Sequence, residues 1–160
     1  MKRQVLRIVI ALGVVASAAS PALGQTWLFT GSATLTPAGD EASASGRAKL
    51  SGQEYSNGWN TGFSGDVSVS CSGLTANATY RIAIFYTAPS GERSFAWIES
   101  PDGAADGRGN LTITSSWGSS GWGGSAGYFD TLEVYRVEPT GYVLVLSGAI
   151  SYRYKYARFH

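Results

Sequence analysis

Residues 67–86, with the sequence VSVSCSGLTANATYRIAIFY, decide the fold class of this chain. In residues 67–71 apolar side chains alternate with serines, which is the period of a strand with one face in water. Residues 80–86 place tyrosine and isoleucine at every second position in the same way. Between the two runs, Ser72-Gly73 and residues 75–78 supply turn chemistry. The stretch therefore predicts a strand, a corner and a second strand.

The same corner resembles a known structural motif. Leu74 precedes Tyr80 by six positions, as in the tyrosine corner of fibronectin type III and related immunoglobulin-like sandwiches. Residues 104–114, AADGRGNLTIT, are similar to a turn and strand of secreted bacterial β-sandwich modules. The resemblance implies a sandwich in which the Tyr80 hydroxyl bonds to the backbone just upstream. It implies no catalytic residues, because such folds host many functions.

The remaining chain adds strands at turn-sized intervals. Strand patterns occupy residues 27–35, 42–51, 94–99, 111–114, 128–137, 142–147 and 150–158. Two of them, 94–99 and 142–147, are apolar on both faces and are expected in the middle of a sheet. Residues 53–65 are expected to form a long loop or a short irregular hairpin, and the low-complexity residues 115–127 a flexible excursion. The sequence therefore predicts an all-β, antiparallel, immunoglobulin-like sandwich of about eight to ten strands.

The first 24 residues read as a bacterial signal peptide rather than as part of the fold. A basic start is followed by a short apolar run and small residues up to Gly24. We expect residues 25–160 to form one domain that is secreted to the periplasm or the exterior, with no transmembrane helix.

Charge and cysteine content limit the functional classes. Without the three basic residues of the signal peptide, the formal net charge changes from +1 to −2. This argues against nucleic acid as a partner, because non-specific binding depends on phosphate neutralisation. Cys71 is the single cysteine, so no internal disulfide can form. Its parity with the neighbouring valines predicts a buried thiol, and an intermolecular disulfide or a reactive thiol is the alternative.

Catalytic patterns are sparse, and we expect no enzyme. His160 is the one histidine and the last residue, where an orienting partner is difficult to supply. No G-x-S-x-G nucleophile elbow occurs. A small hydrolase with two carboxylates remains the lesser alternative.

Residues 101–110, PDGAADGRGN, form a candidate metal loop. Asp102, Asp106 and Asn110 lie four positions apart among glycines, and calcium takes oxygen ligands from such loops. The spacing matches neither the EF-hand loop nor the glycine-rich calcium nonapeptide, and the same residues are ordinary turn formers. A plain turn without a cofactor is the expectation, and calcium is the alternative.

Aromatic residues in two glycine-rich stretches are the candidate ligand-binding residues. Tyr55, Trp59 and Phe63 lie in one stretch, and Trp117 and Trp122 in the other. Exposed rings on loops of a rigid scaffold suit sugars. The alternative is that the rings fold back to cover the core.

The C-terminal strand pattern alternates Tyr152, Tyr154 and Tyr156 with Arg153 and Lys155. The tyrosines are expected to face the core and the cations water, with a small outer-membrane β-barrel as the alternative. The leading functional expectation is a non-enzymatic module for adhesion or matrix contact with a protein or polysaccharide surface. A carbohydrate-binding module that uses the loop aromatics is the runner-up.

Overall fold

The computed structural model describes residues 24–56, 61–87, 90–97, 102–121 and 125–157. The predicted signal peptide, apart from Gly24, and His160 lie outside these residues. Among the described residues, no helix has the length and apolar character needed to span a membrane.

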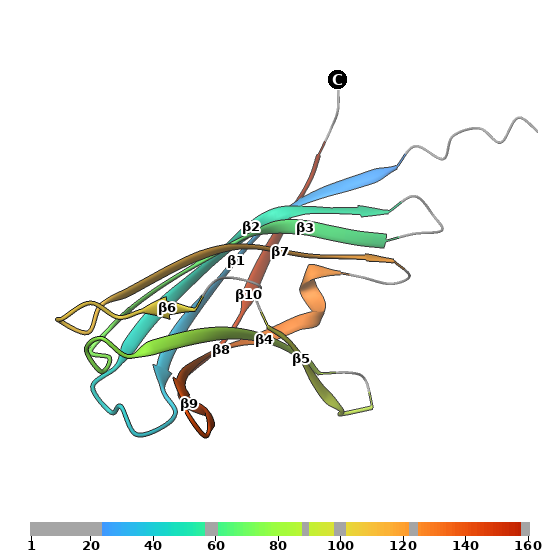
Figure 1. The fold of residues 1–160 in the computed structure, drawn as a ribbon. Helices are drawn as coiled ribbons and strands as arrows, with labels where there is room; N and C mark the ends of the chain where they lie inside the picture. Colours follow the sequence, from blue (N-terminus) through green and yellow to red (C-terminus); the bar gives the residue numbers. More distant parts are fainter. Residues whose placement is uncertain (1–23, 57–60, 88–89, 98–101, 122–124, 158–160) are drawn as a thin grey trace, which may run out of the picture.

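The described strands pair in antiparallel fashion in one curled sheet (Figure 1). This confirms the predicted all-β, antiparallel class. The strands are β1 (Gln25–Pro37), β2 (Ser45–Ser56), β3 (Thr61–Ser72), β4 (Thr79–Thr87), β5 (Arg93–Trp97), β6 (Gly103–Ala104), β7 (Leu111–Gly121), β8 (Phe129–Glu138), β9 (Gly141–Ala149) and β10 (Ser151–Tyr156). A single 3₁₀ turn, η1 (Ala126–Tyr128), precedes β8 within the described part of the chain.

Strand β1 connects two portions of the sheet. Residues 27–32 of β1 pair with β10, and residues 36–37 pair with β9, while β2 occupies the other side of β1. We call β10, β1, β2, β3 and β7 the first portion, and β5, β4, β8 and β9 with the short β6 the second portion. Figure 1 shows β1, β2, β3 and β7 running side by side above β4, β8 and β9.

The core receives alternate side chains from both portions. The first portion supplies Leu35, Val67 and Ile113, and the second supplies Ile84 and Val134, all in one buried cluster. The period of two in these strands determines which side chains are buried, because successive residues point to opposite faces. The face that each portion turns toward this cluster is called inner below, and the opposite face outer.

The predicted corner has the expected geometry. Leu74 and Tyr80 are buried, and Gly73 and Asn77 adopt positive φ angles of 72° and 60°. The backbone N–H of Thr75 donates to the Tyr80 hydroxyl at 3.0 Å, five residues upstream of the ring. The expected contact between the hydroxyl and the upstream backbone is therefore confirmed.

Two stretches predicted to be irregular form regular strands. For residues 53–65 the prediction is a long loop or a short irregular hairpin. A hairpin is present, but it is long and regular: β2 runs to Ser56, β3 begins at Thr61, and the two strands pair along their whole length. The glycines serve close approach rather than turning: a Cβ on Gly52 would lie 2.6 Å from the Cα of Gly65 and 2.8 Å from the Phe29 ring. Glycine thus makes room for a core ring.

The expected flexible excursion at residues 115–127 is also wrong for its first half. β7 continues to Gly121 and pairs with β3 along this whole length. Small polar residues fit here because the outer face is wet, while Trp117 packs on the inner face. Low complexity therefore marks a strand with one packed ring rather than a linker.

The two strands expected in the middle of the sheet have different outcomes. β9 lies between β8 and β1, and its Val145 and Leu146 are fully buried, as predicted. β5 instead ends the strand order and pairs only with β4 among the described strands, so its expected central place is wrong. Phe95 of β5 is 50% exposed and rests against Phe85, with ring centroids 5.3 Å apart.

We predict that Gly65→Ala destabilises the fold by about 1–3 kcal/mol, because the new methyl group overpacks a close strand pair. Its Cβ would lie 2.2 Å from the Ser51 carbonyl oxygen. Urea unfolding of the purified domain measures the loss. Gly107→Ala is the matched control, since nothing lies within 4 Å of the added Cβ. Equal stability of the two variants would contradict the packing role of Gly65.

Candidate functional site

The predicted aromatic platform is not assembled from its described members. Trp59 and Trp122 lie outside the described residues. Trp117 packs on the inner face, with its ring centroid 4.7 Å from that of Phe63 and 5.4 Å from that of Phe129. Tyr55 is 37% exposed and belongs to the outer face, because it alternates with the inner-face residues of β2. The structure therefore does not bring Tyr55 and Trp117 together.

A different set of rings is half-exposed on the inner face of the first portion. Trp27 and Tyr156 are paired across β1 and β10, with ring centroids 5.0 Å apart. Trp27, Tyr154 and Tyr156 are 38%, 43% and 44% exposed, and we call these three residues the aromatic strip. Glu54 lies opposite Trp27 in register, and its carboxylate accepts hydrogen bonds from the hydroxyl of Ser125 and the backbone N–H of residue 126.

The aromatic strip corrects one expectation for the C-terminal strand. The tyrosines of β10 share the inner face with Phe29, as their parity predicts, but only Tyr152 is mostly covered. Tyr154 and Tyr156 are too exposed to be core residues. The alternation identifies the face correctly, but the sequence does not indicate where the covering layer ends.

The acidic loop residues all have protein partners. Asp106 accepts hydrogen bonds from the backbone N–H groups of Asn110 and Arg108, both at 2.8 Å, and from the Asn110 side chain. These contacts, led by the Asn110 backbone, hold the pKa of Asp106 below its ordinary value. Asp102 instead binds the Arg81 guanidinium through both oxygens, at 2.6 and 3.1 Å. The loop is therefore a turn closed by Asp106. The Asp102 side chain binds Arg81 and does not converge with Asp106 on a common site.

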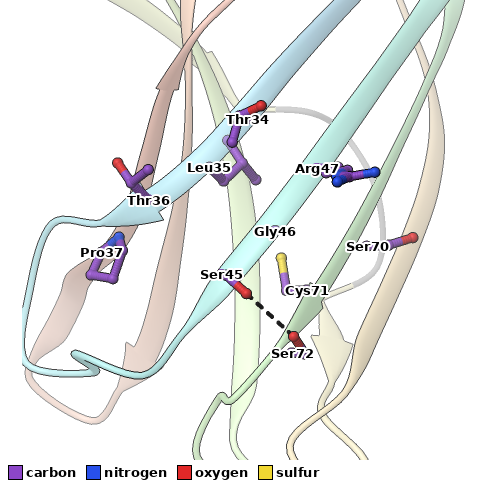
Figure 2. A pocket seen from close by; sticks show the side chains of 10 residues that line it. All are labelled: Thr34, Leu35, Thr36, Pro37, Ser45, Gly46, Arg47, Ser70, Cys71 and Ser72. Carbon is purple, nitrogen blue, oxygen red and sulfur yellow. Dashed lines mark hydrogen bonds between the residues drawn. The ribbon is translucent and has the colours of Figure 1, made fainter.

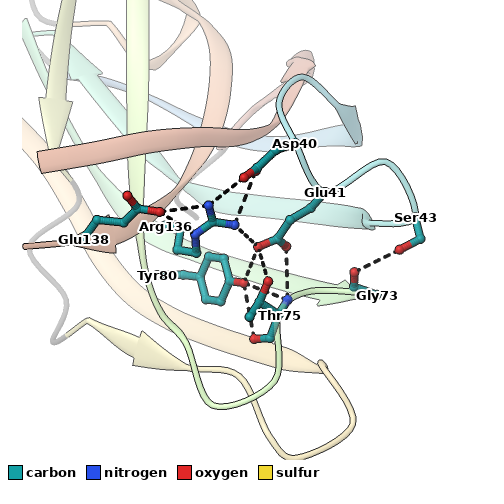
Figure 3. Close-up of polar contacts among 8 residues, drawn as sticks. All are labelled: Asp40, Glu41, Ser43, Gly73, Thr75, Tyr80, Arg136 and Glu138. Carbon is teal, nitrogen blue, oxygen red and sulfur yellow. Dashed lines mark hydrogen bonds and ion pairs between the residues drawn. The ribbon is translucent and has the colours of Figure 1, made fainter. Parts of the chain in front are cut away.

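An ionic network centred on the buried Glu41 carboxylate lies at the corner and was not predicted from the sequence (Figure 3). Arg136 contacts Glu41 at 2.6 Å, Asp40 at 2.7 Å and Glu138 at 2.9 Å. The Tyr80 hydroxyl donates to Glu41 at 2.8 Å. The network thereby joins the connection between β1 and β2 to β4 and β8.

The charges in this network are matched by direct contacts. Burial opposes ionisation of Glu41, but hydrogen bonds from Arg136, Thr75 and Tyr80 outweigh it and keep the pKa of Glu41 below its ordinary value. Burial and the adjacent Glu41 carboxylate raise the pKa of Tyr80 to about 12, so the hydroxyl stays protonated at neutral pH. The contacts explain the network as a structural clamp.

An open pocket of about 510 Å³ lies where β1, β2 and β3 run side by side (Figure 2). Its lining combines serine and threonine side chains with Arg47 and Cys71. Cys71 is 6% exposed, and burial raises the pKa of its thiol to about 12. The thiol is thus a core residue that is protonated at neutral pH, which confirms the expected burial and argues against a nucleophile.

Comparison with known proteins adds no assignment. No family model matches the chain, and neither a curated protein nor a solved structure matches it.

We predict that Arg136→Gln destabilises the domain by about 3–5 kcal/mol at neutral pH, because it leaves the buried Glu41 carboxylate without its cation. In the wild type, the lowered pKa of Glu41 means that the folded state binds this proton less readily than the unfolded state does. Its stabilisation is therefore present at neutral pH and is lost as the pH falls below the ordinary glutamate pKa of about 4.3.

Urea unfolding at neutral pH and at acidic pH measures both effects, and the variant should show a weaker acid dependence. Arg81→Gln is the control. The side chains of Arg81 and its partner Asp102 are 31% and 27% exposed, so this variant should lose much less stability than Arg136→Gln. Equal losses in the two variants would show that the network is not a clamp.

Proposed function

We propose that the protein is a secreted, non-enzymatic module of the immunoglobulin-like sandwich type that acts by surface contact. The observation that supports this is the outer face of the first portion. Five neighbouring strands, β10, β1, β2, β3 and β7, present exposed and mostly uncharged side chains there. On β1 these are Leu28, Thr30, Ser32 and Thr34. A broad sheet face of this kind suits a flat partner better than a small substrate.

The distribution of carboxylates supports contact over catalysis. The acids that lie near one another, Asp40, Glu41 and Glu138, share Arg136. Glu133, which is 4% exposed, accepts hydrogen bonds from Arg93 at 2.7 Å and from Tyr135 at 2.5 Å. These acids thus already have charged or hydroxyl partners, as ion pairs that maintain a fold do.

To test the contact role, Ser51→Cys is labelled with a long polyethylene glycol maleimide. Ser51 lies in the middle of the outer face, between Thr30 and Asp66 in register. The wild-type protein should co-sediment with at least one of insoluble cellulose, chitin and cross-linked polygalacturonate, and the polymer label should abolish retention. Cys71 is buried and should not react.

Thr140→Cys, in the exposed turn between β8 and β9, is the matched control, and its label should leave retention unchanged. Retention on none of the three matrices, or full retention with the label on position 51, would refute the proposal.

A second candidate function, sugar binding, is favoured by the aromatic strip. Trp27, Tyr154 and Tyr156 offer half-exposed ring surface close to one another, with the Glu54 carboxylate beside Trp27 in register. Sugars combine stacking on such rings with hydrogen bonds to polar side chains. The strip replaces the loop platform as the surface to be tested.

We predict that Trp27→Ala weakens the binding of neutral cello- or chito-oligosaccharides about tenfold, because one stacking surface is lost. Isothermal calorimetry measures the change. Tyr55→Ala, on the outer face, is the control and should bind as the wild type does. A loss confined to Tyr55→Ala would favour the loop platform and exclude the strip.

A further inference from the structure

Basic residues of the outer face form a line along β1. Lys155 and Arg153 of β10 are opposite Leu28 and Thr30 of β1, respectively. Lys49 and Arg47 of β2 are opposite Ser32 and Thr34. Four successive outer-face positions of β1 thus each have one cation beside them, first on the β10 side and then on the β2 side. At about 3.4 Å per residue, the four positions span roughly 20 Å, with a cation about every 7 Å along the strand direction. The β10 pair and the β2 pair are also offset sideways by about two strand spacings, roughly 10 Å.

These four cations differ from most others in the described part of the chain. Arg81, Arg93 and Arg136 all make ion pairs. Arg47, Lys49, Arg153 and Lys155 are exposed, and the ion pairs among the described residues include none of them. Asp66 is the acid that the outer faces of β10, β1, β2, β3 and β7 carry within the described residues. The face is therefore locally positive on a domain of net negative charge.

Hydroxyl groups fill the space between the cations. Thr30, Ser32 and Thr34 lie along β1, and Ser51 and Ser151 lie beside them on β2 and β10. We propose that this line binds an acidic polysaccharide, with carboxylates of the polymer on the cations and sugar hydroxyls on the serines and threonines. This inference rests on the contact function proposed above and assigns its partner class.

The arrangement favours a polysaccharide over nucleic acid. A uronate polymer carries one charge per sugar with hydroxyls between, which matches sparse cations separated by serine and threonine. Nucleic acid presents denser phosphate charge and is bound through many basic residues. Single strands also need aromatic stacking platforms, and among the described residues Tyr55 is the exposed ring on the outer face of these strands.

Calorimetric titration with soluble polygalacturonate tests the assignment. The single change Arg47→Gln should weaken binding roughly two- to fivefold, as expected for a surface ion pair. The fourfold variant, with glutamine at residues 47, 49, 153 and 155, should weaken it on the order of 50-fold if the contributions add. Added salt should weaken wild-type binding and leave the residual binding of the fourfold variant nearly unchanged.

Two single changes separate the line from overall charge. Arg108→Gln alters the net charge as Arg47→Gln does, but it lies in the turn before β7, and binding should not change. Asp66→Asn removes the acid from the face and should tighten binding about twofold. Circular dichroism checks that every variant is folded.

Three outcomes would overturn the assignment: wild-type affinity in the fourfold variant, equal affinity for fully methyl-esterified polygalacturonate, or tighter binding to duplex DNA than to polygalacturonate. Failure of this inference and failure of the contact function can be told apart. The protein could bind cellulose or chitin in a way that the label on residue 51 blocks, and yet show no affinity for polygalacturonate. That result would support the contact function and refute only the acidic polysaccharide as its partner. If the label on residue 51 does not block polygalacturonate binding, both the contact function of the outer face and the acidic partner are refuted.

Discussion

The hydrogen bond from the Tyr80 hydroxyl to Glu41 is the contact on which the corner and its surroundings depend. A buried carboxylate is costly unless charge and hydrogen bonds compensate it, and here Arg136 supplies the charge while Tyr80 and Thr75 supply hydrogen bonds. The compensation requires three chain segments at one place: the β1–β2 connection, the corner before β4, and the end of β8. Glu41, Tyr80 and Arg136 at this end of the sheet therefore stabilise the fold. Binding surfaces are better sought on the outer face and at the far end of β1.

The change of partner along β1 produces both of these surfaces. β9 pairs with β1 at residues 36–37, near the ionic network, and β10 takes its place at residues 27–32. The first portion therefore extends past the tightly packed core at the Trp27 end, where rings on its inner face stay half-exposed. On the opposite face, the same pairing sets the β10 cations beside β1. A single strand register thus positions the aromatic strip and the line of cations on opposite sides of the sheet.

Features that depend on neighbouring residues could be predicted, and features that depend on distant pairing could not. The corner is local, since Leu74 and Tyr80 are six residues apart, and its geometry followed from the sequence. Glu41 and Arg136 are 95 positions apart, and no periodicity connects them. Gly65 falls in a stretch predicted as a loop or a short irregular hairpin because glycine favours turns, whereas in the structure Gly52 and Gly65 allow two paired strands and the Phe29 ring to approach closely. The aromatic candidates were predicted in loops for the same reason, whereas Trp27, Tyr154 and Tyr156 lie on strands.

The net charge of −2 of residues 25–160 obscures the charge distribution that the strand register creates. Screening at physiological salt confines electrostatic attraction to about 8 Å, so a bound polymer senses the charges of the face it touches rather than the sum over the domain. Along β1 that face is positive, because none of the four cations lies directly opposite a carboxylate. The one acid on the face, Asp66, lies opposite Ser51. Five acids elsewhere, Asp40, Glu41, Asp102, Glu133 and Glu138, are paired with Arg81, Arg93 and Arg136. Strand register, rather than composition, therefore determines which polyanion the surface can accept.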